Sequence, residues 1–401
     1  MADKIPEGWK ECKIKNLTKR ITSGGTPSTK VKEYYGGEIP WLNTKEIGFN
    51  RITDTEVKIT ESGLNNSSAK WIEPNSVIVA MYGATAGKIA INKIPLTTNQ
   101  ACCNLTIDEK IACYNFVYYY LYNSYDELEN LASGAAQQNL NVGIISDFLI
   151  SLPPLAEQRA IASLLSSLDD KIDLLHRQNK TLEDMAETLF RQWFVEEASE
   201  DWEECTLNDL CSQIASGGTP STKIDSYYNG NINWYSTKEL KDNFLYESEN
   251  KITKEGLDNS SARLFPTGTV VIAIYAAPTV GRLGILANEA SFNQAACGLV
   301  ANEALCCSEF IYLYLKNQRD KLNLMASGSA QQNLNVGKIK SYPAFKVPKD
   351  LMNKFKDAVQ PNLKKINNNT LQIRTLEKIR DTLLPKLISG EVRVTLTEEK
   401  A

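Results

Sequence analysis

This chain contains the same sequence unit twice, and the repetition constrains its fold more than any other feature. The octapeptide SGGTPSTK occurs at Ser23–Lys30 and again, unchanged, at Ser216–Lys223, which is 193 residues later. Further pairs of segments match at this shift or at one residue more: ITESGLNNSSAK at 59–70 with ITKEGLDNSSAR at 252–263, YGATAGK at 82–88 with YAAPTVGR at 275–282, and ASGAAQQNLNVGII at 132–145 with ASGSAQQNLNVGKI at 326–339. Solenoid repeats have periods of about 20–50 residues, so we expect a duplicated domain instead.

Each copy begins with a part that mixes short strands, turns and helices. The apolar runs VIVAMYG at 77–83 and VVIAIYA at 270–276 end at turns and are typical of buried strands. NFVYYYLYN at 115–123 and EFIYLYLKN at 309–317 predict helices packed in the same domain. Glycine and proline at Gly24–Pro27 predict a loop.

Each copy then ends in a long helical segment. After Pro153 and Pro154 the chain continues for roughly 40 residues without Gly or Pro, which predicts a helix of ~60 Å. Residues that are apolar except for Asn179 fill two interleaved heptad positions, as in a coiled coil: Ile161, Leu168, Leu175, Leu182 and Leu189, with Leu165, Ile172, Asn179 and Ala186. Asn179 is either a device that fixes the register or a tolerated polar residue.

The second helical segment has a weaker seam. Phe355, Leu376 and Leu383 occupy the matching sites and Leu363, Ile366 and Ile373 keep an apolar stripe, whereas Asn362, Asn369 and Arg380 interrupt it. Residues 153–200 carry a balance of −5 and residues 347–401 a balance of +4, so the two helices are complementary partners.

These patterns predict an α+β fold with an internal duplication. A mixed α/β globular domain is followed each time by a long α-helix, and the two helices pair as an antiparallel coiled coil with pseudo-twofold symmetry. The expected boundaries place the first globular domain at 1–152, a central spacer helix at 153–195, the second globular domain at 196–346, and the C-terminal spacer helix and tail at 347–401.

Composition excludes several classes of protein. The single histidine, His176, lies in a polar helical stretch, so Ser-His-Asp, Cys-His and histidine-based metal sites are not expected. Nine cysteines include two adjacent pairs and no CxxC, which is neither a disulfide framework nor a zinc pattern. No secretory signal or membrane span is visible, so we expect reduced thiols in the cytoplasm, with no metal and no cofactor.

The sequence lacks the motifs expected of two classes of DNA-modifying enzyme. A DNA methyltransferase needs a glycine-rich cofactor loop and an Asn/Asp-Pro-Pro-aromatic motif, and Pro153-Pro154 lacks both flanks of that motif. A metal-dependent nuclease needs clustered carboxylates near a lysine, and Thr44-Lys45-Glu46 is too little for that. A coiled-coil adaptor that does not bind DNA stays open as an alternative, although it would leave two matched globular domains unexplained.

The motifs together resemble the specificity subunits of type I restriction–modification systems. The resemblance rests on the GGTPS loop, ITESGL, GATAGK, the TNQA segment at 98–101, LPPLAEQRAIASLL, and LLPKLISGEVRV near the C-terminus, and it covers nearly the whole chain. It implies a subunit without catalysis of its own, in which each globular domain reads one half of a split double-stranded DNA site. The helices would set the spacing and dock two methyltransferase subunits, and restriction subunits would join that assembly.

The length of the helices supports the reading of a split DNA site, whereas the net charge of the chain argues against strong DNA binding. A stiff helix of ~60 Å matches somewhat under two turns of B-DNA, which suits a split site with an unread middle. The isoelectric point is about 5.5, however, and neither globular domain is net basic. Because non-specific affinity for DNA comes largely from Lys and Arg on phosphates, we expect the chain alone to bind DNA weakly.

Repetition and side-chain chemistry select candidate DNA contacts. Loop, hydroxyl and cationic groups can reach phosphate, and amides can pair with adenine edges. In the first copy these are Gly25, Thr26, Ser28, Lys30, Lys45, Lys88, Gln137, Gln138 and Asn139. In the second copy they are Gly218, Thr219, Ser221, Lys223, Lys238, Arg282, Gln331, Gln332 and Asn333. Each of them has an alternative interpretation as scaffold, in turns or as caps of backbone groups.

Two further expectations concern surfaces. Residues that read bases are expected where the copies differ, for example at Phe49–Thr55 and Lys241–Glu247. Exposed residues at the start of the first long helix, Glu157, Gln158 and Arg159, are expected to contact the methylating subunit. Because the copies share identical loops, the two half-sites are expected to be related and read in opposite orientation.

Overall fold

The computed structural model describes residues 5–133, 140–275, 279–327 and 334–394. The chain divides into two compact units. The first unit contains residues 1–172 and 374–401, and the second contains residues 173–373. Each unit therefore holds one globular domain together with a segment of each long helix.

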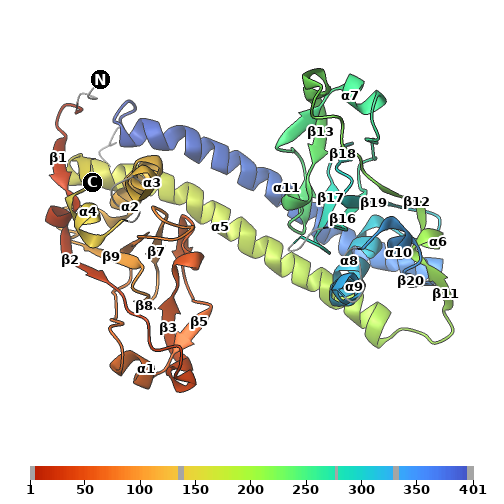
Figure 1. The fold of residues 1–401 in the computed structure, drawn as a ribbon, viewed down its shortest axis with the longest axis horizontal. Coiled ribbons are helices and arrows are strands. Elements are labelled where there is room, and N and C mark those ends of the chain that lie inside the picture. Colours follow the sequence, from red (N-terminus) through yellow and green to blue (C-terminus); the bar gives the residue numbers. More distant parts are fainter. Residues whose placement is uncertain (1–4, 134–139, 276–278, 328–333, 395–401) are drawn as a thin grey trace, which may run out of the picture. The chain divides into compact units, whose positions relative to one another are not determined.

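The first domain is built on a five-stranded sheet (Figure 1). Its strands, in spatial order, are β2 (Thr18–Ser23), β9 (Cys102–Ile107), β6 (Val77–Ala80), β7 (Ile89–Asn92) and β4 (Asn50–Ile52). All pairs are antiparallel except β4 with β7. A three-stranded sheet follows the order β5 (Val57–Ile59), β3 (Tyr35–Leu42) and β8 (Thr97–Thr98), and β1 (Lys10–Lys13) pairs with β10 (Leu149–Leu152).

The second domain repeats this topology strand for strand. Its five-stranded sheet has the order β12 (Cys211–Ser216), β19 (Ala296–Ala301), β16 (Val270–Ala273), β17 (Leu283–Leu286) and β14 (Asn243–Leu245). The smaller sheets are β15 (Asn250–Ile252), β13 (Tyr228–Tyr235) and β18 (Ser291–Phe292), and the pair β11 (Glu203–Thr206) with β20 (Pro343–Lys346). The predicted duplication is confirmed at the level of strand order and strand direction.

Short helices occupy corresponding places in the two domains. In the first they are α1 (Glu61–Asn65), α2 (Tyr114–Asn123), α3 (Tyr125–Ser133) and α4 (Val142–Asp147). In the second they are α6 (Leu207–Leu210), α7 (Lys254–Asp258), α8 (Ser308–Asn317), α9 (Arg319–Ser327) and α10 (Val336–Lys340). The helices predicted from the aromatic runs at 115–123 and 309–317 are α2 and α8, each beginning one residue earlier than expected.

The two long helices are α5 (Leu155–Arg191), continued by a π-helical turn at Gln192–Glu196, and α11 (Lys349–Ile388). Within each unit their segments run in opposite directions. In the first unit Asp169 contacts Arg380, and Glu157, further back on α5, contacts Arg393 beyond the end of α11. In the second unit Asn179 contacts Asn369, and Phe190 packs near Phe355.

The long helices belong to the cores of the domains. Ile161 and Leu165 of α5 and Leu387 of α11 are buried in the core of the first unit. Phe190 of α5 and Phe355 of α11 are buried in the core of the second. Full burial of one such side chain contributes roughly 1.5–3 kcal/mol, so these contacts attach each domain firmly to the helices. Within the described residues, no helix is long and apolar enough to span a bilayer.

Candidate nucleic-acid interface

Motifs that are far apart in the sequence meet in the first domain. The loop at Gly24–Pro27 lies against the TNQA segment: the Gly25 amide donates to the Thr98 carbonyl at 2.8 Å, and the Thr26 hydroxyl donates to the side chain of Gln100. The indole nitrogen of Trp41 donates to the Gly25 carbonyl at 2.9 Å. A tryptophan side chain therefore braces the loop from inside the domain.

The TNQA segment in turn contacts the turn after β6. The Tyr82 hydroxyl donates to the Gln100 carbonyl at 3.1 Å, and the Met81 amide donates to the Ala101 carbonyl at 2.8 Å. The Leu140 amide, at the end of the QQN segment, donates to the Met81 carbonyl at 3.0 Å. We call the set of residues 24–27, 81–82, 98–101 and 140 the first motif cluster.

The second domain builds the same cluster from residues 217–220, 274–275 and 292–295. The Gly218 amide donates to the Phe292 carbonyl at 2.9 Å, and the Thr219 hydroxyl donates to the side chain of Gln294. The Trp234 indole donates to the Gly218 carbonyl at 2.8 Å. The sequence predicted a loop at this site, and the structure adds that the loop is fixed by its neighbours.

The glycines of these loops are required by close packing. A Cβ atom on Gly25 would overlap the backbone of Ser68 and Ala69, and one on Gly218 would overlap Ser261 and Ala262. The identical glycines therefore have a structural reason to be present. Hydrogen bonds to neighbouring segments hold the backbone of each loop and the Thr26 and Thr219 side chains in place.

The serine and lysine residues that follow the two GGTP loops are exposed to solvent. Ser28 and Lys30 are exposed in the first domain, and so are Ser221 and Lys223 in the second. Among the described residues, neither Lys30 nor Lys223 has a salt-bridge partner. Their ammonium groups are therefore available to a phosphate.

Lys45 and Lys238 are each engaged in an ion pair. Lys45 lies 2.5 Å from Glu56, and Lys238 pairs with Glu249 at the corresponding place. The hydrogen bond to Glu56 raises the pKa of Lys45 above its ordinary value. Both partners in each pair are more than half exposed, so competing with the carboxylate costs little free energy.

Lys88 and Arg282 follow matched tight turns. Gly87 and Gly281 have φ angles of 80° and 79°, a left-handed conformation that favours glycine. Lys88 and Arg282 are half-buried beside them. The amide runs Gln137, Gln138 and Asn139, and Gln331, Gln332 and Asn333, lie outside the described residues.

The segments in which the copies differ contain a structural exchange that the sequence did not reveal. Phe49 and Asp242 occupy the same left-handed turn, with φ angles of 60° and 58°. Phe49 stacks on Tyr122 of α2 at 4.5 Å and meets Tyr125 edge-on at 5.2 Å. Asp242 instead forms an ion pair with Arg319 of α9 at 2.5 Å. These two residues attach the turn to its own domain, so their difference has a packing cause.

Two further attachments, of β4 and of α8 to helix α5, were not predicted from the sequence. Arg51 of β4 forms a salt bridge with Asp170 of α5, and Lys316 of α8 contacts Glu183 and Glu187 of the same helix. The signal was the excess of acid in residues 153–200, which we assigned to pairing of the helices alone. The acidic residues of α5 also hold cations of the globular domains.

The expected exposure of the partner residues is wrong for two of the three. Glu157 is 7% and Gln158 is 1% exposed, whereas Arg159 is exposed. Glu157 accepts hydrogen bonds from Arg393 at 2.8 Å and from the Trp9 indole at 3.3 Å. Gln158 accepts from the Cys113 amide at 2.9 Å and donates to the Pro153 carbonyl at 2.8 Å. The first turn of α5 faces the domain core, which sequence periodicity alone did not indicate.

A known protein family matches both halves of this chain. The family described as "Type I restriction modification DNA specificity domain" matches residues 6–184 and again residues 199–350. The chain belongs to this family. Its two matches coincide with the two copies of the repeat, which supports the resemblance found in the motifs.

Relatives and a solved structure extend over nearly the whole chain. The type I restriction enzyme MjaIX specificity subunit of Methanocaldococcus jannaschii is 29% identical, covering 98% of this chain and 95% of the relative. The MjaVIII specificity subunit of the same organism is 23% identical over 98% of this chain and 94% of the relative. The crystal structure of the type I restriction-modification S subunit from M. genitalium has a TM-score of 0.61 at 18% identity, covering 98% of this chain and 99% of that one. That likeness shows a shared fold.

Proposed function

We propose that this chain is the non-catalytic DNA-recognition subunit of a type I restriction–modification complex and that each motif cluster faces one half of a bipartite duplex site. The observation that carries the proposal is the construction of the same braced loop twice, once in each family match. Because its proposed ligand is genomic DNA, the chain would act in the cytoplasm.

The proposed contacts divide into fixed and adaptable groups. The hydroxyls of Thr26 and Ser28, and of Thr219 and Ser221, would position the duplex. Gly25 and Gly218, whose amides are bonded to the Thr98 and Phe292 carbonyls, would hold the loops that carry them. Lys30 and Lys223 would bind phosphate directly, and Lys45 and Lys238 would exchange their surface carboxylates for phosphate. Lys88, Arg282 and the two amide runs complete the proposed interface, with the amides reading adenine edges.

The domain roles follow the boundaries expected from the sequence. Residues 1–152 and 196–346 would be the two target recognition domains, and residues 153–195 and 347–401 would provide the spacer helices. Two methylating subunits would dock, one for each helix-plus-domain unit, and restriction subunits could join them. Arg159 is the proposed contact, while Glu157 and Gln158 would support it from inside the domain. Because the clusters match, the half-sites would be related and read in opposite orientation.

The lysine pair provides the decisive test. Lys30→Ala and Lys223→Ala should each weaken binding of the assembled methyltransferase complex to its target, and the slope of log affinity against log salt should fall by ~0.9 for each phosphate that is no longer neutralised. Lys365→Ala, on an exposed position of α11, is the matched control and should leave the slope unchanged. The measurement is a salt series of fluorescence anisotropy titrations with a duplex taken from the methylated motif.

If the slope of log affinity against log salt is the same for all variants, then Lys30 and Lys223 do not contact phosphate. A complex that assembles with its methylating subunits but shows no sequence preference would overturn the recognition role altogether. That second outcome would favour the adaptor alternative, in which the chain tethers other proteins without binding DNA.

A further inference from the structure

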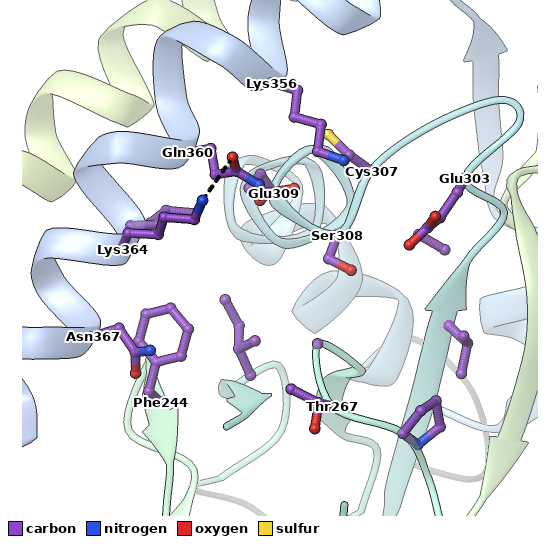
Figure 2. Close-up of a pocket in the computed structure, with 16 residues that line it drawn as sticks. Phe244, Thr267, Glu303, Cys307, Ser308, Glu309, Lys356, Gln360, Lys364 and Asn367 are labelled. Atoms are coloured by element: carbon purple, nitrogen blue, oxygen red, sulfur yellow. Dashed lines mark hydrogen bonds between the residues drawn. The ribbon is translucent and has the colours of Figure 1, made fainter. Parts of the chain in front are cut away.

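A cavity of about 380 Å³ lies in the second unit, between the globular domain and helix α11 (Figure 2). Phe244 of β14, Ile285 of β17 and Leu363 of α11 supply apolar wall. Lys356, Gln360 and Lys364 come from successive turns of α11, and Ser308 stands at the start of α8. The volume falls within the ~300–1,000 Å³ of small-molecule sites, which are also mostly apolar with a few convergent polar groups.

Large side chains stand at the corresponding positions of the first unit. Where the second copy has Ser308, Ala287 and Gly268, the first has Tyr114, Lys93 and Asn75. Lys93 contacts the other two, since its ammonium group lies 5.1 Å from the centre of the Tyr114 ring and donates to Asn75 at 3.1 Å. The fold therefore does not by itself require an open space here. Of the three smaller residues in the second copy, Gly268 and Ser308 line the cavity.

The charges are also exchanged between the copies. In the first unit the domain supplies the cation Arg51 and the helix supplies the acid Asp170. The second unit has Phe244 at the place of Arg51 and Lys364 at the place of Asp170. Lys364 donates to the neutral amide of Gln360 at 3.1 Å, and Lys356 has no hydrogen-bond or salt-bridge partner among the described residues. The helix therefore presents cations here in place of the acid of the first unit.

Among the described residues, neither glutamate of the lining forms a salt bridge with Lys356 or Lys364. The Glu309 carboxylate accepts from the Gln360 amide at 3.4 Å, and Glu303 stands on the opposite side of the opening, away from Lys364 (Figure 2). Gln360 therefore lies between Glu309 and Lys364 as a neutral bridge. Lys356 and Lys364 therefore place two ammonium groups on the α11 side of the cavity, next to the apolar side chains of its wall.

The geometry points to a binding site for a small organic anion, with its carboxylate or phosphate on the α11 side of the cavity, where Lys356 and Lys364 lie, and its apolar body against Phe244, Ile285 and Leu363. Such a ligand would supply the negative charge that Asp170 provides in the first unit. It would also fill the space that Tyr114 and Lys93 occupy there, and so brace the second domain on α11. The site lies in the second unit alone, and occupying it does not require DNA binding.

Three probes with one apolar body and different charges test the class of ligand. Naphthalene-2-carboxylate, 2-naphthylmethanol and 2-naphthylmethylammonium are titrated into the full chain, and binding is followed by isothermal calorimetry and by ligand-observed NMR. We expect the carboxylate to bind, the alcohol to bind about tenfold more weakly, and the ammonium compound not to bind, because only the carboxylate forms charge-assisted hydrogen bonds with lysine.

Two kinds of variant locate the site. The double variant Lys356→Met/Lys364→Met should reduce carboxylate affinity to that of the alcohol, whereas Lys354→Met/Lys365→Met, on exposed positions of the same helix, should leave it unchanged. The variant Ala287→Lys/Ser308→Tyr rebuilds the pair found in the first unit and should abolish binding of both probes. Far-UV circular dichroism and the thermal midpoint establish that each variant is folded.

Equal binding of all three probes would overturn the charge assignment. Carboxylate binding that survives in the folded filled-cavity variant would place the ligand elsewhere, and absence of binding at millimolar probe in the wild-type chain would exclude the site. Gly268→Asn, which again copies the first unit, provides an independent way to close the cavity if the double variant does not fold.

Discussion

Asn369 donates a hydrogen bond from its buried side-chain amide to the Asn179 side chain at 2.8 Å, inside the helix pair of the second unit. The sequence showed these two residues separately, one as a polar residue on a seam and the other as an interruption of the opposite seam. Their contact explains both. A paired polar contact in an apolar seam favours one register, because every shifted register leaves at least one amide without a partner.

The asparagine pair predicts a difference between single and double substitutions. Asn369→Leu alone should destabilise the second unit by ~1–3 kcal/mol, since Asn179 loses its partner. Asn179→Leu/Asn369→Leu should recover that loss or exceed wild-type stability, because two leucines complete the seam. Urea unfolding followed by circular dichroism measures both. Equal stability of the single and double variants would argue against coupling between the two amides.

The exchange of Phe49 for Asp242 predicts a compensating pair in the first unit. Phe49→Asp should destabilise that unit by roughly 1–3 kcal/mol, because it removes the stacking on Tyr122. Adding Tyr125→Arg recreates the Asp242–Arg319 ion pair and should restore part of the stability. The aspartate also suits the left-handed turn better than phenylalanine does.

The test of this pair is a double-mutant cycle in urea. Tyr125→Arg alone serves as the reference for the second substitution. A coupling energy close to zero would show that the two domains do not hold this turn by interchangeable means.

The Asp169–Arg380 pair should be important for the stability of the first unit. Both side chains are only 14% exposed, and Asp169 also accepts from the Tyr119 hydroxyl at 2.6 Å. Arg380→Met should cost ~3 kcal/mol, because a largely buried carboxylate loses its cation. The exposed Lys180–Asp184 pair is the control, and Lys180→Met should cost under ~0.5 kcal/mol. Comparable destabilisation of the two variants would contradict the role of burial.

Cysteine labelling provides a prediction that depends on pH. Burial raises the pKa of Cys103, Cys211, Cys297, Cys306 and Cys307 to about 12, so at pH 8 these thiols are almost entirely protonated and unreactive. Iodoacetamide should modify the half-buried Cys12 and Cys113 first and leave these five unmodified in the native protein. Mass spectrometry of tryptic peptides measures this. Labelling should increase as pH rises and become general in urea.

The long helices predict a change of DNA spacing when both are lengthened. Ten residues separate Asp169 from Asn179 on α5, and eleven separate Asn369 from Arg380 on α11. Four residues inserted after Arg177 and four after Thr375 would lengthen both helices by ~6 Å and keep the seam nearly in phase. The unread gap should grow by one or two base pairs, while the bases read stay the same.

The methylated motif of the insertion variant, obtained by methylome sequencing, tests this spacing. The same insertion after Arg177 alone is the control, and it should weaken the helix pairing because α11 no longer matches. If the variant with both insertions is folded and active but its unread gap is unchanged, then the helices do not set the spacing and serve only as a docking surface.

Segments repeated 193 residues apart were enough to predict the duplication. Local pattern was enough to predict the strands β6 and β16, the aromatic helices and the two long helices, because each of these elements depends on a pattern within a short window. The attachments between elements could not be predicted in this way. Phe49 and Asp242 have opposite chemistry at one position, and their roles depend on Tyr122 and Arg319, which lie more than seventy residues away in sequence. The burial of Glu157 likewise depends on Arg393, which no heptad pattern connects to it.

The Glu157–Arg393 contact has a consequence for the order in which the protein is made. Residues 374–394 pack in the first unit, where Leu387 and Ile388 enter the core, while the second unit lies wholly within residues 173–373. A ribosome therefore delivers the whole second unit before it delivers the last piece of the first. We expect the domain encoded first to mature last, waiting for its final helix while the later domain folds ahead of it.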